Sequence, residues 1–320
     1  MPEKKHANSG KHVVLEPAQL DGAVRVAFDL SWGKARGFIE TGKIRVNGEV
    51  VTETNRKVIA GAEIELHMNA PRPNRSRLEF DRIVYLDTHV VIVSKPPGIS
   101  TVAFDETETD TLDDRVRRAL EAREKSSHQK GQRGQGRSPL GVVHRLDKET
   151  SGLLVFTRTW AAKQSLSSQF RSHSVHRRYL AIVHGEARAQ TIRTHLVPNR
   201  GDGLRGSIER QKKPVPKEQA QLAVTHVEIV DRLDGATLIA CRLETGRTHQ
   251  IRVHLSEEGN PIVGERVYIR NYDHEPIPAP RVMLHAAELG FMHPAMNKEM
   301  RWNEPAPKDF EETALRLKKK

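Results

Sequence analysis

A cluster of charged residues separates two apolar runs in the stretch GVVHRLDKETSGLLVFTRT, Gly141–Thr159. The runs contain Val and Phe and are typical of strands. Asp147 lies between them, flanked by Arg145 and Lys148. A carboxylate near cations stays ionised and can act as a nucleophile or a base. The alternative is a solvated turn with a surface ion pair, and local sequence alone favours that alternative.

A second set of polar residues lies in GRTHQIRVHL, residues 246–255. Gln250, Arg252 and His254 alternate there with apolar residues, which predicts a strand with one polar and one apolar face. A polar face this dense could line a cleft. The alternative is an antiparallel strand with one face in water.

The sequence does not predict a metal or nucleotide cofactor. Among the sixteen histidines we find no HEXXH motif and no spacing typical of metal ligands. His249 and His254 flank Arg252, whose charge would repel a metal cation. The segment GQRGQG has no preceding strand and lacks the lysine and hydroxyl of a P-loop. We therefore expect chemistry that uses side chains alone.

Composition indicates a globular protein that meets a polyanion. The chain has 320 residues, 37% of them hydrophobic and 29% charged, and a formal net charge of +11. Such a basic balance most often indicates nucleic acid. The single cysteine, Cys241, excludes an internal disulfide and a multi-cysteine zinc site, and we expect it to be buried in a protein of a reducing compartment. No segment is typical of a membrane span or an export signal, so we expect a cytoplasmic location.

The N-terminal part predicts a small α+β unit. Residues 1–20 are expected to form a flexible arm, residues 21–67 the unit and residues 68–79 a linker. Ser31 can cap a helix, and Gly42 can end it. Asn47 and Gly48 predict a hairpin because both tolerate positive φ, and a strand over residues 62–67 ends the unit.

The rest of the chain predicts many strands and few helices. We expect an α+β domain over residues 80–307, with a mixed, mainly antiparallel sheet, and a basic tail over residues 308–320. The segments expected within it are two strands in IVYLDTHVVIVSKPPGIS, a basic low-complexity loop at 125–139, an amphipathic helix at 160–171, a strand RRYLAIVHG carrying Tyr179, an irregular connection at 193–219 and a hairpin about Asp234 and Gly235.

Five segments in order resemble the motifs of RluA-type pseudouridine synthases. The charged stretch contains HRLDKETSGLLVF, and GRTHQIRVHL with GNPIVGERVY resembles a second family motif. RRYLAIVHG, IVYLDTHVVIVSKPPG and LHAAELGFMHP resemble three more. The resemblance spans about Phe80–Pro307. The N-terminal unit is similar to the small RNA-binding domain first named from a ribosomal small-subunit protein.

The resemblance implies that uridine in RNA is converted to pseudouridine without a cofactor. The uracil is detached from ribose, turned, and rejoined through carbon 5, with water kept out. Asp147 corresponds to the essential carboxylate, which attacks the ribose or the base or removes a ribose proton. Tyr179 corresponds to the tyrosine that stacks on the uracil, and Arg252 to the basic partner of the carboxylate. Arg145 corresponds to an arginine that fills the gap left by the flipped nucleotide.

These inferences predict an RNA-bound enzyme that acts as a monomer, without DNA or membrane as a partner. Large-subunit ribosomal RNA is the expected substrate, and transfer RNA is the alternative. Two other classes are a metal-dependent ribonuclease and a non-catalytic RNA-binding or ribosome-assembly factor. The basic residues expected to contact RNA in the N-terminal unit are Lys34, Arg36, Lys43 and Arg45.

Overall fold

The computed structural model describes residues 9–52, 54, 56–70, 78–104, 108, 110–127, 140–210, 220–270 and 272–318. The chain divides into two compact units: Met1–Arg77 with Ala103–Thr111, and Leu78–Val102 with Leu112–Lys320. The smaller unit has its own buried apolar cluster, which includes Leu20, Ile39 and Ile64.

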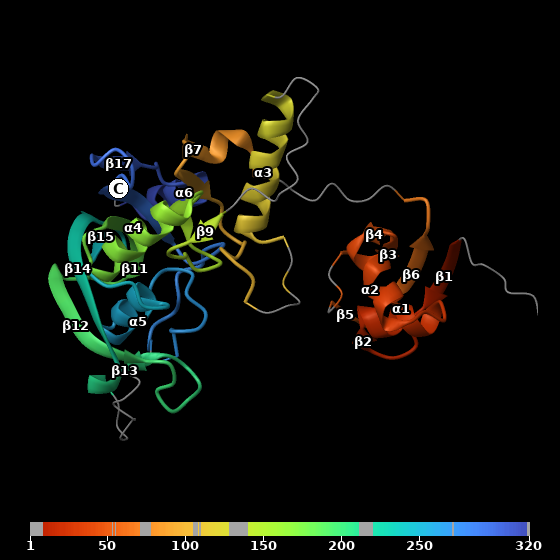
Figure 1. Ribbon diagram of the computed structural model, residues 1–320. Coiled ribbons are helices and arrows are strands. Elements are labelled where there is room, and N and C mark those ends of the chain that lie inside the picture. The colour runs from red at the N-terminus through yellow and green to blue at the C-terminus, as the bar shows by residue number, and fades with distance from the viewer. Residues whose placement is uncertain are drawn as a thin grey trace, which may run out of the picture. The chain divides into compact units, whose positions relative to one another are not determined.

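The smaller unit packs two helices with short strands (Figure 1). Its elements are β1 (Ser9–Val13), β2 (Ala18–Gln19), α1 (Leu20–Ala27), α2 (Trp32–Glu40), β3 (Ile44–Val46), β4 (Glu49–Val50), β5 (Lys57–Val58) and β6 (Glu63–His67). As expected, the Ser31 side chain accepts a hydrogen bond from the Lys34 amide and caps α2. Asn47 and Gly48 both have positive φ at the turn between β3 and β4, so the hairpin prediction is confirmed.

The expectation of a flexible arm over residues 1–20 is wrong for the part that the structure describes. β1 pairs antiparallel with β6 from Ser9↔His67 to Val13↔Glu63, and β2 pairs with β5. β1 reads Ser-Gly-Lys-His-Val, so it has little apolar pattern of its own. Backbone pairing with β6 supplies the order. The helix α1, which sequence reasoning did not predict, follows directly.

The larger unit is built on an eleven-stranded sheet. The strand order is β13-β12-β14-β15-β11-β16-β10-β8-β7, with β17 on β16 and β9 on β10. β10 and β16 pair in parallel, and the other pairs are antiparallel, so the predicted mixed, mainly antiparallel α+β fold is confirmed. Its elements are η1 (Phe80–Arg82), β7 (Ile83–Leu86), β8 (Val90–Lys95), α3 (Leu112–Ser127), β9 (Gly141–Val142), β10 (Ser151–Thr157), α4 (Trp160–Arg171), β11 (His176–His184), β12 (Gln190–Val197), β13 (Gly206–Ser207), η2 (Ile208–Arg210), β14 (Gln221–Arg232), β15 (Ala236–Leu243), α5 (Gln250–Glu257), β16 (Leu284–Met292), β17 (Glu299–Asn303) and α6 (Lys308–Arg316).

Several predicted elements of this unit are confirmed. The two strands before the Pro-Pro-Gly turn are β7 and β8, the amphipathic helix is α4, and Asp234 and Gly235 join β14 to β15. Cys241 is fully buried. No helix of the described residues is long and apolar enough to cross a membrane.

Three predictions for this unit need correction. The connection predicted as irregular contains the end of β12, together with β13 and η2. The predicted basic tail contains the helix α6. One apolar and one acidic side chain anchor this helix: Phe310 is 2% exposed, and Asp309 pairs with Arg281 at 2.6 Å. Residues 125–127 of the predicted basic loop belong to α3, and the remainder lies outside the described residues.

The segment predicted as a two-faced strand is the helix α5. All residues from Gln250 to Leu255 are buried. The alternation of polar and apolar residues in this segment therefore does not correspond to one solvent-exposed face and one buried face. At 3.6 residues per turn, Gln250 and His254 share one side of the helix and Arg252 lies on the other. Gln250 and His254 both contact Thr225 of β14, and β12 and β14 curve around α5 (Figure 1).

Candidate active site

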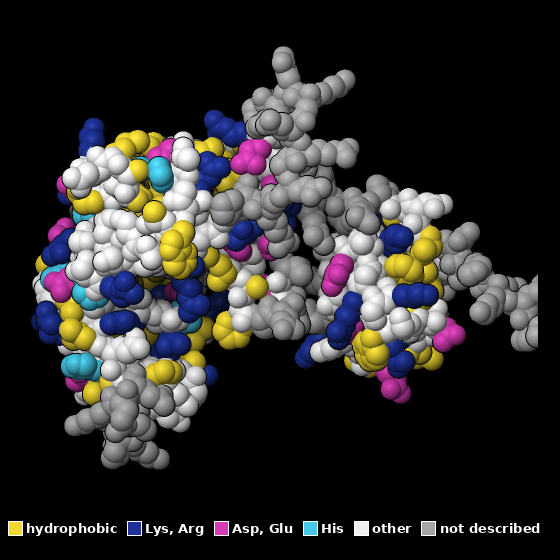
Figure 2. Space-filling view, in the orientation of Figure 1, with side chains coloured by type: hydrophobic (Ala, Val, Ile, Leu, Met, Phe, Trp, Pro, Cys, Tyr) yellow, Lys and Arg dark blue, Asp and Glu magenta, His cyan; other side chains and the backbone are white. Residues whose placement is uncertain are grey.

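One pocket of about 540 Å³ collects the residues that the sequence singled out. It lies between the segment before β10, strand β11, and the ends of α4 and α5. Figure 2 shows lysine and arginine side chains gathered around a hollow in this region of the larger unit. The lining residues are Val143, His144, Arg145, Leu146, Asp147, Thr150, Ser167, Phe170, Arg171, His173, Arg177, Tyr179, Leu243, Gly246, Arg247, Thr248, His249, Gln250, Ile251, Arg252 and Leu284.

Asp147 is carried by a short loop whose backbone is held by a buried lysine. Nζ of Lys95, the last residue of β8, donates to the carbonyl oxygens of Pro96, Lys148 and Thr150 at 3.0, 2.9 and 2.7 Å. Lys95 is 1% exposed, and burial lowers its pKa to about 7, against the opposing effect of Asp147 and Glu149. Two of the three carbonyls follow Asp147 directly in the loop, so this lysine positions the carboxylate without bonding to it.

The strand that follows the loop depends on a glycine. Gly152 has φ +113°, and a Cβ there would lie 2.2 Å from the Ala286 carbonyl oxygen. Only glycine allows β10 to approach β16 this closely. Arg281 adds a contact on the same side, since its Nη1 donates to the Glu149 carbonyl oxygen at 3.2 Å. These contacts explain why a Ser-Gly pair directly follows the charged loop.

Arg252 lies between two carboxylates and is bonded closely to one of them. Its Nε and Nη2 donate to Oε2 and Oε1 of Glu265 at 2.7 and 2.8 Å. Its Nη1 lies 3.6 Å from Oδ2 of Asp147. Glu265 is fully buried as a side chain and also accepts from the amides of Val267 and Tyr268. The geometry therefore fixes the guanidinium by one carboxylate and presents its remaining side to the other.

His249 is a neighbour of Asp147 that sequence reasoning did not assign to the site. Its Nε2 lies 3.8 Å from Oδ1 of Asp147, and its Nδ1 is 2.7 Å from the Tyr268 hydroxyl. His249 has φ +59° at the start of α5. Burial lowers the pKa of His249, with Asp147 acting in the opposite direction. A residue with left-handed backbone angles cannot be recognised from the sequence unless the surrounding turn is known.

Tyr179 and His144 form the apolar wall of the pocket. Tyr179, on β11, is 8% exposed, and burial raises the pKa of its phenol. His144 stacks on Phe170 with ring centroids 4.6 Å apart and accepts a hydrogen bond from the Val155 amide at its Nε2. Burial, followed by the charge of Arg177, lowers the pKa of His144. His144 therefore shapes the wall as an uncharged ring.

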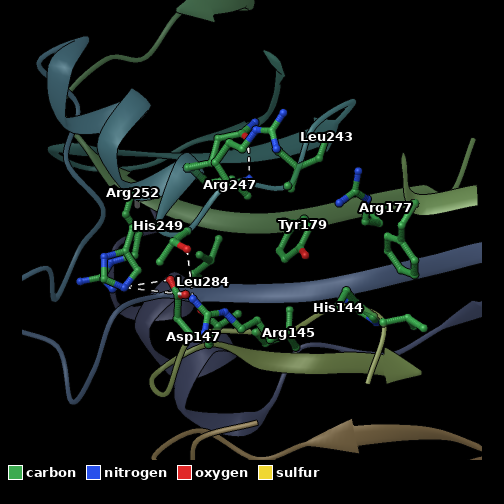
Figure 3. Close-up of a pocket in the computed structure, with 18 of the residues that line it drawn as sticks. His144, Arg145, Asp147, Arg177, Tyr179, Leu243, Arg247, His249, Arg252 and Leu284 are labelled. Carbon is green, nitrogen blue, oxygen red and sulfur yellow. Dashed lines mark hydrogen bonds and ion pairs between the residues drawn. The ribbon is translucent and has the colours of Figure 1, made fainter. Parts of the chain in front are cut away.

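Arg145 is an exposed arginine of the pocket lining. Its Nη2 donates to Oγ1 of Thr248 at 3.1 Å, so it links the Asp147 loop to the segment before α5. Figure 3 shows Arg145 beside Asp147, with Arg252 and His249 on the other side of the carboxylate. The structure thus brings together the three residues predicted to be catalytic, Asp147, Tyr179 and Arg252, and Arg145, which was predicted to fill the gap of the flipped nucleotide.

The chain is similar to known proteins in sequence and in fold. Residues 89–257 match the family model described as RNA pseudouridylate synthase. The chain is 37% identical over 239 residues to a ribosomal large subunit pseudouridine synthase D of Zymomonas mobilis, covering 72% of this chain and 70% of the relative. It is 32% identical to the protein of that name from Pseudomonas aeruginosa, covering 88% and 85%. The fold is similar to the human RNA pseudouridylate synthase domain containing 4, with a TM-score of 0.56, 23% identity, and 74% and 93% of the two chains covered.

The chain belongs to the RNA pseudouridylate synthase family.

Membership confirms the resemblance and the enzyme class predicted from the sequence. The family match runs from the turn before β8 to the end of α5, so it includes the Asp147 loop, β11 and Arg252. The chain is a pseudouridine synthase, an isomerase that acts on RNA. The roles of the individual residues are taken up below.

The pocket of this pseudouridine synthase is strongly basic. Five arginines and one carboxylate line it: Arg145, Arg171, Arg177, Arg247, Arg252 and Asp147. Within the described part of the chain, no group of three or more His, Cys, Asp or Glu residues is arranged to hold a metal ion. A polyanion is the substrate class that such a lining favours.

The basic residues predicted for the N-terminal unit lie on α2, on β3 and, for Lys43, directly before β3. Lys34 and Arg36 are exposed on α2, and Arg45 is exposed on β3. Arg36 pairs with Asp21 at 2.9 Å, and Lys43 lies over the Phe38 ring at 5.2 Å.

Sequence reasoning missed four groups that support the pocket: Lys95, Arg177, Glu265 and Arg281. Each is 6% exposed or less. Their burial is the property that distinguishes these four side chains from charged side chains at the surface.

Proposed function

We propose that this pseudouridine synthase isomerises uridine in large-subunit ribosomal RNA, with Asp147 as the catalytic carboxylate. The observation that carries the proposal is the convergence of Asp147, Arg252 and Tyr179 on one basic pocket. The relatives named for the ribosomal large subunit support the choice of RNA. Those relatives are bacterial, so we keep a cytoplasmic location within the proposal. Action as a monomer also stays within the proposal.

Asp147 is proposed to act on a nucleotide that has left the base stack. An enzyme that works on the sugar or the inner edge of a base must extrude that nucleotide first. Arg145, which is exposed and bonded to Thr248, is proposed to enter the gap that the nucleotide leaves. Tyr179 offers its ring to the uracil. Asp147 supplies the carboxylate for breaking and re-forming the glycosidic bond.

Arg252 is proposed to complement the negative charge of Asp147. Its Nη1 is 3.6 Å from that carboxylate, and Glu265 holds the remaining guanidinium nitrogens. A fixed cation in a partly dry pocket stabilises a carboxylate more than the same cation would in water. Together with the wall formed by Tyr179 and His144, Leu243 and Leu284 limit water in the pocket, as an isomerisation without hydrolysis requires.

The N-terminal unit is proposed as a second RNA contact. Lys34, Arg36, Lys43 and Arg45 carry its candidate phosphate contacts. Contacts of this kind position an RNA strand, whereas the pocket reads the extruded base.

The test is to treat unmodified transcripts of large-subunit ribosomal RNA and of transfer RNAs with the protein and to map pseudouridine at single-nucleotide resolution. We expect pseudouridine in the ribosomal transcript, no strand cleavage, and full activity with a chelator once the RNA has been folded. The D147N variant serves as the control and is expected to leave the transcripts unmodified. Pseudouridine in transfer RNA alone would replace the proposed substrate. Cleavage that needs a metal would replace the proposed reaction.

A further inference from the structure

Arg177 is a buried cation in the pocket wall beside Tyr179. The two residues are two positions apart on β11, so their side chains share one face of the strand, and both line the pocket. Arg177 is 6% exposed. Figure 3 shows Tyr179 between Asp147 and Arg177. The pocket therefore has a positively charged end that lies beyond the tyrosine as seen from the carboxylate.

The guanidinium of Arg177 is incompletely bonded. Its Nη2 donates to the Glu244 carbonyl oxygen at 2.8 Å, and its centre lies 5.5 Å from the Phe170 ring centroid. Its Nε is buried and has no hydrogen-bond partner among the residues that the structure describes. Burial lowers the pKa of Arg177, and Tyr179 is the group that acts in the opposite direction. By contrast, the other buried arginine of the pocket, Arg252, has a carboxylate on either side.

A buried cation without a counter-charge destabilises the folded state. Glycine at position 246 nevertheless leaves space for the guanidinium of Arg177. Any side chain there would collide with it, because a Cβ on Gly246 would lie 2.6 Å from Nη1 of Arg177. A buried charged group without a protein partner is expected where a bound ligand supplies the missing partner. The missing partner of Arg177 is therefore an anion that enters through the pocket.

We propose that Arg177 binds a backbone phosphate of the RNA strand, next to the uridine that contacts Tyr179. This inference rests on the proposed function. Phosphate is the anion that every RNA nucleotide carries, and a guanidinium fork matches its oxygens. Arg177 and Tyr179 lie two positions apart on β11, and two positions along a strand span roughly 7 Å. This distance is comparable to the separation between a base and its own phosphate. Arg177 thus acts as a substrate-positioning residue, while Asp147 does the chemistry.

The test compares R177M with R178M, the matched control. Arg178 is the next residue of β11, is half-exposed, and pairs with Glu288 at 3.0 Å instead of lining the pocket. RNA affinity is measured against salt in the D147N background, with whichever transcript the wild-type protein modifies. We expect R177M to weaken binding at least tenfold and to make the salt slope shallower by about 0.7, the value for one phosphate contact on a single strand. R178M should change neither.

Two further measurements separate phosphate binding from a structural role. G246A keeps the arginine but displaces its Nη1, so it should weaken RNA binding in the same direction as R177M. Thermal unfolding without RNA should be at or above the wild-type temperature for R177M, because the substitution removes an uncompensated buried cation. Turnover assays with Asp147 intact should show a raised KM and a nearly unchanged kcat at saturating RNA.

The outcomes distinguish this inference from the proposed function. A wild-type protein that modifies no transcript counts against the proposed function. A wild-type protein that modifies RNA, with R177M equal to it in affinity and salt slope, overturns the phosphate contact. A lowered kcat with unchanged KM, or lost thermal stability with unchanged RNA binding, overturns it as well.

Discussion

Asp147 and Arg252 face each other at 3.6 Å without forming a close ion pair, because Glu265 holds the guanidinium at 2.7 and 2.8 Å. A closely bonded Asp147 would have its oxygens occupied. The observed spacing leaves the 23% exposed carboxylate of Asp147 open toward the pocket while a fixed positive charge stays near it. The buried pair of Arg252 and Glu265 is thus a rigid support for a third, reactive group.

Replacing the carboxylate of Asp147 by an amide should abolish pseudouridine formation. Asp147→Asn has nearly the same shape but cannot act as a nucleophile or base, so we expect turnover to fall at least 1,000-fold, or about 4 kcal/mol in activation free energy. Folding and RNA binding should persist. Glu149→Gln, two residues along the same loop, is the matched control and should keep activity. Turnover of D147N within tenfold of wild type would remove Asp147 from the mechanism.

The buried pair of Arg252 and Glu265 should show strong coupling in stability. Arg252→Met leaves Glu265 as an unpaired buried carboxylate, which costs about 3–5 kcal/mol. The double variant R252M/E265L removes both charges and should be more stable than R252M, although it should remain inactive because Asp147 has lost its cation. Urea unfolding together with a turnover assay checks both parts. A double variant that is no more stable than R252M would contradict the pairing account.

The buried His254 should make stability depend on pH. Its ring bonds to Thr194 and Thr225, and burial lowers its pKa to about 4 from 6.5, with Glu209 opposing. Below pH 6.5, His254 binds a proton in the unfolded chain but stays unprotonated in the folded chain. The stabilisation is therefore complete above pH 6.5 and is lost as the pH falls toward 4, by about 3 kcal/mol in total.

The comparison that checks this effect is urea unfolding of wild type and His254→Gln between pH 7 and 4. The variant should lose less stability over that window, because glutamine does not titrate. His12→Gln, which replaces an exposed histidine of β1, should behave as wild type does. Parallel pH profiles for wild type and H254Q would show that His254 does not contribute.

A chain beginning at Leu78 should fold and keep the chemistry of the pocket. The apolar cluster around Val93, Phe156 and Ile182 contains no residue before Leu78, so the larger unit has a core of its own. If the N-terminal unit contacts phosphates, the shortened chain should bind RNA more weakly, with a salt slope shallower by about 0.7 for each lost single-strand contact. Full-length K34Q/R45Q should show part of the same change. Equal affinities and slopes would exclude the N-terminal unit as an RNA contact.

The sequence alone determined the family and predicted site residues that line one pocket. Several motifs in order predicted roles for Asp147, Tyr179, Arg252 and Arg145 because each lies within a short, specific run of residues. Local turn chemistry was also readable, as with Ser31 at the start of α2 and Asn47-Gly48 in the hairpin, since caps and tight turns depend on neighbouring residues only.

Tertiary structure decided which elements those residues lie on and what holds them. Alternation around Arg252 predicted a strand, but complete burial made the segment a helix whose polar groups find partners on β14 and in Glu265. The order of residues 9–13 came from pairing with β6, fifty or more residues away. Lys95 and Arg177 look like surface charges in the sequence. Burial depends on packing between distant segments. It made Lys95 the support of the Asp147 loop and left Arg177 with a buried Nε that has no hydrogen-bond partner among the described residues.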